Sequence, residues 1–306
     1  MKILKFGGGC LKSSEEIKKI PKIIDSFKGE KILLVLSAFG KLTNMLEQKK
    51  YDEIYQFLSS LMNDLGFSTE QKEKLIQMPI APSFEGQCFN LNFIQFLKSN
   101  ELDYPTRICV GEYISCIIIQ HFLSKHSIDS IIFDAALSIK THKWNLNSQS
   151  AKFDYCIKPN KSTFSFYNSN GFKEKKMFSE ISKNIFITQG FIASESSTLD
   201  VIKTSNLKRS TLGREGSDYS AAIFGKMFNV DQIILFKDVD GVYDSDPKKN
   251  SHAKLYKELS YQDAINICDN TATIIHPNTI RYLMKFNIPI LVKNYNNMKS
   301  SGTYIF

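Results

Sequence analysis

Short apolar runs recur along this 306-residue chain, and most of them are followed by a turn and then by a helical pattern. The run at residues 31–38, KILLVLSA, is almost continuously apolar, which is typical of a strand buried on both faces of a parallel sheet. Repetition of strand, turn and helix predicts an α/β fold with a mostly parallel central sheet flanked by helices. The predicted strands are residues 2–6, 31–38, 107–110, 130–135, 185–191, 232–236 and 288–292. The predicted helices are residues 13–20, 111–123, 217–228, 260–267 and 277–286.

One stretch interrupts this pattern. Residues 140–183 are polar and rich in Asn, Ser and Lys, and STFSFYNSNGF at residues 162–172 alternates between polar and aromatic side chains. A period of two is typical of strands. We therefore expect a hairpin and loop insertion here rather than another strand–helix unit.

The net charge of +8 raises the question of a nucleic-acid partner. The lysines are spread along the whole chain in small groups, with no arginine-rich run and no basic stripe interleaved with aromatic residues. Such a distribution favours solvated lysine surfaces over a nucleic-acid interface. Anionic small substrates are compatible with this charge.

The spacing of the cysteines and the length of the apolar runs indicate in which cellular compartment the protein is found. The six cysteines form no C-x-x-C pair, which favours reduced thiols over a disulfide framework or a zinc site. The longest apolar runs, ILLVL and CIII, fall far short of the roughly 20 residues that span a bilayer. The N-terminus lacks the features of a signal peptide. We expect a cytoplasmic protein with no membrane partner.

The chemistry is expected in the turns, because open α/β sheets bind ligands at the carboxyl ends of their strands. Candidate turns are KFGGG at residues 5–9, SAFGKLTN at 37–44, GE at 111–112, TLGREGSD at 211–218 and KDVDGVYDSDPKK at 237–249. A glycine-rich turn that opens a helix offers backbone N–H groups to an anion such as phosphate. Neither G-x-G-x-x-G nor G-x-x-x-x-G-K-[ST] is present, so these turns match neither a dinucleotide fingerprint nor a Walker loop.

Taken together, the turns resemble those of aspartate kinases, in the amino-acid kinase superfamily. The resemblance covers nearly the whole chain, and its most specific segment is GREGSDYSAA at residues 213–222. The matching segments lie at residues 5–8, 37–44, 111–115, 188–192, 211–222, 238–248, 259–264 and 274–279.

The resemblance implies an α/β/α sandwich that phosphorylates the side-chain carboxylate of L-aspartate with ATP, the first step toward lysine, threonine and methionine. It implies one domain over residues 1–306, with an amino-acid-binding lobe at 1–184 and a nucleotide-binding lobe at 185–306. No regulatory domain, and hence no strong inhibition by lysine, is expected. The small molecules L-aspartate and ATP are the implied partners, and a homo-oligomer stays open.

At the phosphate end, the resemblance assigns four residues. Lys5 would stabilise charge on the transferred phosphoryl group, and Asp218 would orient Lys5. Gly7 and Gly8 would let the backbone approach that group. A carboxylate acceptor has a pKa of about 3.9 and needs no general base at neutral pH. Catalysis then depends on positioning and charge neutralisation.

At the aspartate end, Arg214 would bind a substrate carboxylate through both oxygens, as the planar guanidinium favours. Glu112 would pair with the substrate ammonium, and Ser37 and Thr43 would add hydroxyl contacts.

The resemblance also assigns a nucleotide pocket. Its expected residues are Lys237, Asp238 and Tyr243, with Lys248 near the phosphates. Mg²⁺ would accompany ATP and be held mainly by phosphates and water, without a protein metal site.

Each assignment has a simpler alternative. Arg214 and Asp218 could form an ordinary surface ion pair, and Glu112 could be a first-turn acid that favours the helix dipole. Ser37 and Thr43 could be turn or cap residues, and Asp238 and Asp240 could be turn formers beside Gly241. His276 is expected to start a helix rather than to act as a catalyst.

The sequence also departs from the aspartate kinase pattern. Gly9 and Cys10 stand where Thr and Ser are usual, which removes two hydroxyl donors. The remaining departures are Lys237 for Thr, Lys248 for Arg, His142 for Asp, Asn270 and Thr271 for an aromatic–Gly pair, and Thr273 for Lys. These changes bear on nucleotide affinity and rate. They leave two alternatives open: another phosphotransferase of the superfamily, or a catalytically weakened amino-acid-binding protein.

Overall fold

The computed structural model describes residues 1–77, 93–99, 102–157, 164–167, 173–176, 180–196, 207–213, 215–245, 247, 249–270 and 274–306. Its central feature is a ten-stranded sheet in the order β12-β14-β13-β11-β1-β2-β8-β3-β6-β7. The strands are β1 (Lys2–Phe6), β2 (Ile32–Leu36), β3 (Ser130–Phe133), β6 (Phe164–Tyr167), β7 (Lys173–Lys176), β8 (Ile185–Gln189), β11 (Ile233–Lys237), β12 (Glu258–Leu259), β13 (Ile290–Asn294) and β14 (Thr303–Ile305). The six neighbours from β13 to β3 run parallel, which confirms the predicted mostly parallel sheet.

The middle of this sheet is buried on both faces. Every residue of β2 and of β8 is buried, as the continuous apolar sequence of β2 predicts. Helices cover the sheet, so strands without a polar face are stable there.

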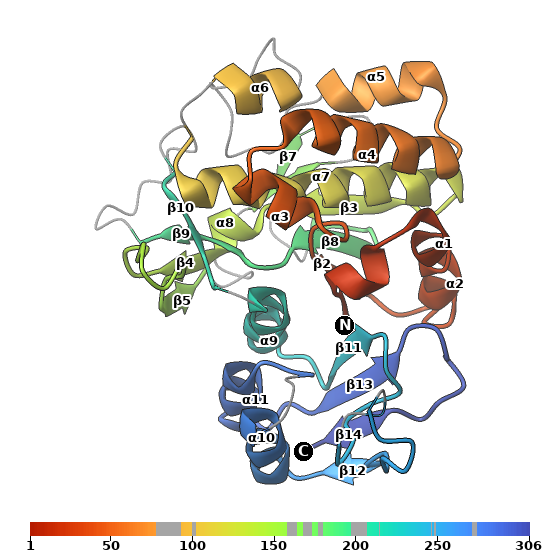
Figure 1. The fold of residues 1–306 in the computed structure, drawn as a ribbon, viewed down its shortest axis with the longest axis vertical. Coiled ribbons are helices and arrows are strands. Elements are labelled where there is room, and N and C mark those ends of the chain that lie inside the picture. Colours follow the sequence, from red (N-terminus) through yellow and green to blue (C-terminus); the bar gives the residue numbers. More distant parts are fainter. Residues whose placement is uncertain are drawn as a thin grey trace.

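The helices gather in two groups along the sheet (Figure 1). Helices α3 to α7 lie at the end that holds β2, β8 and β3, α10 and α11 lie beside β13, and α9 lies between the two groups. The helices are α1 (Ser14–Ile17), α2 (Ile20–Asp25), α3 (Leu42–Glu47), α4 (Tyr51–Asp64), α5 (Thr69–Gln77), α6 (Phe93–Ser99), α7 (Tyr104–Lys125), α8 (Ala135–Ser138), α9 (Gly216–Phe228), α10 (Tyr261–Asn270) and α11 (Pro277–Met284), with a 3-10 turn η1 (Gly8–Leu11).

One predicted strand is wrong. Residues 107–110 belong to α7, which runs without interruption from Tyr104 to Lys125. The side chain of Asp103 caps this helix by accepting a hydrogen bond from the Thr106 N–H, and Pro105 lies in the first turn. The run RICV is apolar because α7 is buried around most of its circumference, and a short apolar run alone does not distinguish a buried helix from a strand.

The predicted hairpin is confirmed, since β6 and β7 pair antiparallel and extend the sheet beyond β3. The structure adds a second, four-stranded sheet that the sequence did not predict, in the order β10-β9-β4-β5. Its strands are β4 (Ile139–Thr141), β5 (Phe153–Cys156), β9 (Ile192–Glu195) and β10 (Arg209–Thr211). None of the helices in the described ranges has the length and apolar character needed to cross a membrane.

Candidate active site

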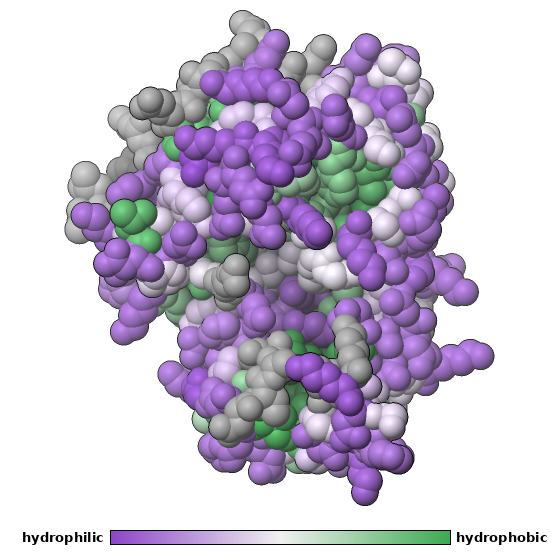
Figure 2. All heavy atoms as spheres, viewed as in Figure 1, coloured by the Kyte–Doolittle hydropathy of each residue, from purple (hydrophilic) through white to green (hydrophobic). Residues whose placement is uncertain are grey.

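A cavity of about 680 Å³ lies at the carboxyl ends of β1, β2 and β11. Figure 2 shows the surface hollowed near the middle of the molecule, between its two larger parts. The lining comes from the turn after β1, the turn after β2, helix α7, the start of α9 and the end of β11. Segments more than 200 residues apart in sequence meet here because parallel strands end at the same edge of a sheet.

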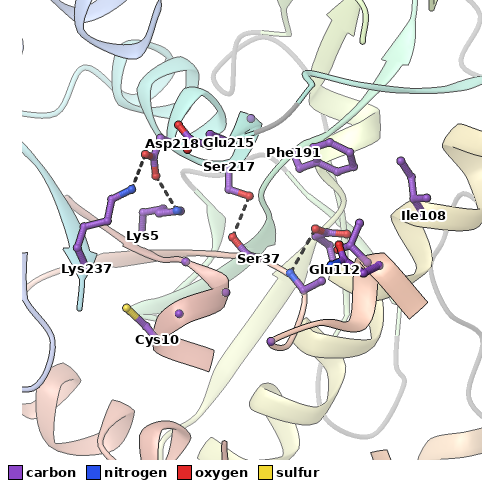
Figure 3. A pocket seen from close by; sticks show the side chains of 18 of the residues that line it. Lys5, Cys10, Ser37, Ile108, Glu112, Phe191, Glu215, Ser217, Asp218 and Lys237 are labelled. Carbon is purple, nitrogen blue, oxygen red and sulfur yellow. Dashed lines mark hydrogen bonds and ion pairs between the residues drawn. The ribbon is translucent and has the colours of Figure 1, made fainter. Parts of the chain in front are cut away.

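Asp218 lies at one end of this cavity, between two lysines (Figure 3). The Nζ of Lys5 is 2.6 Å from Oδ1 of Asp218, and the Nζ of Lys237 is 2.8 Å from Oδ2. The carboxylate is 0% exposed, and the Lys5 and Lys237 side chains are 6% and 18% exposed. The predicted meeting of Lys5 with Asp218 is therefore observed as a buried ion pair, and the simpler reading of Asp218 as part of a surface ion pair is wrong.

The charges of these three groups depend on one another. Burial alone would raise the pKa of Asp218, but the ammonium groups of Lys237 and Lys5 outweigh it and hold that pKa at about 2. Burial lowers the pKa of Lys5. The attraction of Asp218 acts in the opposite direction, but the charge of Lys237 adds to the lowering, and the pKa of Lys5 stays below its ordinary value. For Lys237, the attraction of Asp218 outweighs burial and raises the pKa. Asp218 is thus fixed as a carboxylate at neutral pH.

The turn after β1 leaves room for the Lys5 side chain. A Cβ atom at Gly7 would lie 3.0 Å from Nζ of Lys5, so glycine at this position keeps the ammonium group in place. Gly8, Gly9 and Cys10 also line the cavity. The Cys10 thiol donates a hydrogen bond to the Phe236 carbonyl, 3.3 Å away, and burial raises its pKa to about 11. This thiol is therefore neutral at physiological pH.

The other end of the cavity contains a buried acid. Glu112 is 4% exposed, and its Oε1 accepts a hydrogen bond from the Ala38 N–H at 3.2 Å. Its Oε2 has no hydrogen-bond partner among the described residues. Burial raises the pKa of Glu112 to about 8, against the hydrogen bond from Ala38. A cationic group that entered the cavity would find an acceptor here.

Hydroxyl groups lie between the two ends. The Ser37 hydroxyl donates to the Ser217 hydroxyl at 2.9 Å (Figure 3), and Thr43 also lines the cavity. Ser37 follows β2 and Ser217 lies in the first turn of α9. This contact joins the strand-end turn to the helix that carries Asp218.

A family comparison agrees with this geometry. The model of the amino acid kinase family matches residues 1–294. This chain belongs to the amino acid kinase family. Among curated proteins, this chain is 30% identical to the bifunctional aspartokinase/homoserine dehydrogenase of Buchnera aphidicola, over 100% of this chain and 36% of that protein. It is 26% identical to the aspartokinase of Chlamydia pneumoniae, over 99% of this chain and 62% of that protein.

Solved structures show the same fold. Escherichia coli aspartokinase III in complex with aspartate and ADP has a TM-score of 0.74 and 22% sequence identity, over 100% of this chain and 64% of that chain. The Clostridium acetobutylicum aspartate kinase has a TM-score of 0.67 and 24% identity, over 100% of this chain and 63% of that chain. This chain spans about a third of the length of the bifunctional relatives it matches.

Two of the predicted site residues, Arg214 and Lys248, lie outside the described residues. Lys237 and Asp238 line the cavity, whereas Tyr243 is not among its described lining residues and instead bridges to Leu255. Thr271 and Thr273 also fall outside the described residues, and Asn270 ends α10.

The geometry settles two simpler readings and locates one departure from the aspartate kinase pattern. Glu112 is not a first-turn acid, because it lies in the middle of α7. His276 is the N-cap of α11, where its side chain accepts a hydrogen bond from the Asn278 N–H, as predicted. His142 lies 3.9 Å from Asp154 and is not among the described lining residues.

The sequence missed several residues that the fold brings into this cavity. Tyr104 and Ile108 come from the first turns of α7, which was predicted partly as strand, and Ser148 and Gln149 come from the polar insertion. The remaining lining residues that were not singled out include Asn44, Glu47, Phe191, Glu215 and Ser217. Glu215 has a left-handed backbone (φ 58°) immediately before α9. Backbone strain of this kind concentrates at functional sites, but only coordinates reveal it.

Proposed function

We propose that this chain transfers the γ-phosphoryl group of ATP to the side-chain carboxylate of L-aspartate, giving 4-phospho-L-aspartate and ADP. The observation that carries the proposal is one cavity with Lys5, Lys237 and Asp218 at one end and Glu112 at the other. The names of the relatives, aspartokinases and bifunctional aspartokinases, support aspartate as the acceptor.

The site needs no general base for this reaction. The side-chain carboxylate of aspartate has a pKa of about 3.9 and is ionised at neutral pH. One of its oxygens attacks the γ-phosphorus, the bond to the β,γ-bridging oxygen breaks, and ADP leaves with that electron pair. What remains for the protein is to align the two substrates and neutralise negative charge. The ammonium of Lys5, directed by Asp218, serves that purpose.

The amino-acid end binds an α-amino acid through opposite charges. Glu112 receives the substrate ammonium on Oε2, the oxygen without a partner among the described residues. Ser37 and Thr43 contribute hydroxyl contacts from the turn after β2. Arg214 binds a substrate carboxylate in this proposal, which rests on its place in the GREGSD segment.

The nucleotide end is proposed to use Gly7, Gly8, Lys237 and Asp238, with Tyr243 and Lys248 farther along the same segment. No three His, Cys, Asp or Glu side chains come together as metal ligands in the described part of the chain. The carboxylates of Glu215 and Asp238 do line the cavity, and they fit a Mg²⁺ ion that is held mainly by phosphates and water. Such an ion would neutralise phosphate charge when ATP is bound.

Two wider aspects stay proposals. The first is the division of a single domain into an amino-acid-binding lobe at 1–184 and a nucleotide-binding lobe at 185–306. The second is a cytoplasmic role in the synthesis of lysine, threonine and methionine.

One observation favours a second candidate, a catalytically weakened amino-acid-binding protein. The Cys10 thiol points to the Phe236 carbonyl and Gly9 has no side chain, so neither offers a hydroxyl to a phosphate. Aspartate binding without turnover is the outcome that this candidate predicts.

A hydroxamate assay with ATP, Mg²⁺, hydroxylamine and one acceptor at a time tests the proposal. Turnover is expected with aspartate and not with glutamate or UMP.

Four variants test the site residues in the same assay. Lys5→Ala and Asp218→Ala are expected to lower kcat by at least about 100-fold, while Glu112→Ala and Arg214→Ala mainly raise the KM for aspartate. Circular dichroism and thermal unfolding check that each variant folds. Wild-type protein that binds aspartate in calorimetry but makes no hydroxamate would contradict the proposal and support the second candidate.

A further inference from the structure

Two lysines from neighbouring strands approach the same carboxylate from the same face of the sheet. In the parallel register of β1 and β11, Lys5 lies opposite Leu235. Lys237 is two residues beyond Leu235, and side chains two apart in a strand point to the same face. Lys237 therefore shares a face with Lys5, and α9 supplies Asp218 above that face. Each carboxylate oxygen faces one ammonium group, at 2.6 Å and 2.8 Å.

By formal charge, Lys5, Lys237 and Asp218 leave one positive charge over, while Asp238 also lines the cavity. Lys5 and Lys237 contribute two ammonium groups, Asp218 contributes one carboxylate, and Cys10 beside them is a neutral thiol because burial raises its pKa. Glu215 also attracts Lys237, but it is exposed and no ion pair joins these two described side chains. Uncompensated charge in a buried site is costly. The cluster is therefore built to receive an anion.

The cavity gives an anion access to this cluster. Lys5, Lys237 and Asp218 all line the cavity, and Figure 3 shows the two lysine side chains converging on the carboxylate from β1 and β11. Lys5 alone would be enough to neutralise Asp218. Lys237, which is the more exposed of the two lysines, adds the charge that Asp218 does not require.

We propose that Lys237 is a second catalytic lysine, which together with Lys5 contacts the non-bridging oxygens of the transferred phosphoryl group while Asp218 holds the two ammonium groups apart. The inference rests on the phosphoryl transfer proposed above. In this arrangement the charge that develops on the phosphoryl oxygens meets two cations already in position, so no group has to reorganise during the reaction.

The test compares two neutral variants at this position. Lys237→Met removes the charge and the hydrogen bond to Asp218, whereas Lys237→Gln removes the charge but keeps a donor for Asp218. Both are expected to lower kcat by about 100-fold or more, the typical effect of deleting one charge-stabilising group, with the KM for ATP within about threefold. The control is Lys293→Met on the adjacent strand β13, since Lys293 donates to the Ser300 carbonyl and is not among the described lining residues.

A structural role would give a different result. If Lys237 only stabilises Asp218, Lys237→Gln keeps a kcat close to that of the wild type and Lys237→Met loses thermal stability, and this outcome overturns the inference. Lys237→Gln remains informative if Lys237→Met fails to fold.

Calorimetry with ADP, Mg²⁺ and tetrafluoroaluminate separates this inference from the proposed function. Tetrafluoroaluminate mimics the phosphoryl group in transfer and requires no knowledge of the acceptor. The wild type is expected to bind ADP more tightly with tetrafluoroaluminate than without it. The Lys237 variants are expected to lose this gain in affinity, while their affinity for ADP alone changes less than about threefold. An unchanged increase overturns the inference even if aspartate proves not to be the acceptor. Absence of turnover with aspartate, by contrast, overturns only the proposed function.

Discussion

At the scale of single residues, Glu112 combines deep burial with an incomplete set of hydrogen bonds. Only Oε1 has a hydrogen-bond donor, the Ala38 N–H, among the described residues. Burial raises its pKa to about 8 from an ordinary value of 4.5. At neutral pH the folded protein therefore binds a proton at Glu112 more strongly than the unfolded chain does. An entering ammonium group would reverse this preference, because opposite charge favours the carboxylate.

We predict that this proton makes stability depend on pH. Between about pH 4.5 and pH 8 the folded state binds more protons at Glu112 than the unfolded state, so the free energy of unfolding falls as pH rises. The stabilisation that proton binding at Glu112 gives the folded state is fully present below pH 4.5 and is lost by the time pH passes 8. Its slope approaches about 1.4 kcal/mol per pH unit. Urea unfolding at pH 5, 6, 7 and 8 measures the slope in the wild type and in Glu112→Gln, which lacks this carboxyl group. Parallel curves for the two proteins would show that Glu112 is ionised in the fold.

At the scale of elements, the position of α9 depends on how closely it approaches the end of β8. A Cβ atom at Gly190 would lie 2.5 Å from Cβ of Ser217 and 2.9 Å from its Cα. The Ser220 hydroxyl accepts a hydrogen bond from the Phe191 N–H at 2.8 Å. The strand end and the first turn of α9 are thus in direct contact, and Asp218 lies in that turn.

Gly190→Ala should force these two elements apart. We expect a loss of about 1–3 kcal/mol in the free energy of unfolding, as for overpacking in a core, together with lower kcat because Asp218 moves relative to Lys5. Gly9→Ala is the matched control for stability, since a Cβ there meets nothing within 4 Å. Urea unfolding and the hydroxamate assay measure the two effects. A Gly190→Ala variant as stable and active as the wild type would mean that α9 shifts without consequence.

At the scale of the whole molecule, the main sheet and the cavity cross the predicted boundary between lobes. Strand β8 follows residue 184 in sequence but lies between β2 and β3. The cavity takes Lys5, Ser37 and Glu112 from before that boundary and Asp218 and Lys237 from after it. A ligand in this cavity would therefore contact both proposed lobes at once.

We predict that ATP stabilises the whole chain in a single unfolding transition. ATP at about 100 times its dissociation constant adds about 2.7 kcal/mol to the free energy of unfolding if it binds only the folded state. Differential scanning calorimetry with and without MgATP measures the shift. Because the central sheet is continuous across residue 184, one peak is expected to move as a unit. Two peaks, of which only one moves with ATP, would show that residues 1–184 and 185–306 unfold independently.

The pattern of apolar residues and turns in the sequence identified much of the fold and part of the site. Buried strands such as β2 are recognisable because they are continuously apolar. The meeting of Lys5 with Asp218 was expected from the resemblance to aspartate kinases. The pattern failed at α7, where burial around most of the helix removed the amphipathic signal. It also failed for the second sheet, whose four short strands come from residues 139–211 and are joined into one sheet only by the pairing of β4 with the distant β9.

By itself, the sequence determined the α/β class, the strand-end turns and the residue types available for phosphate and ammonium binding. Tertiary structure alone decided that Lys237 meets Asp218, that Glu112 points into the cavity from a helix, and that burial raises the pKa of its carboxyl group. The physical reason is that periodicity and turn chemistry act over a few residues. Burial, pKa and the spacing of charges depend on neighbours that are far away along the chain and come together only when the sheet forms.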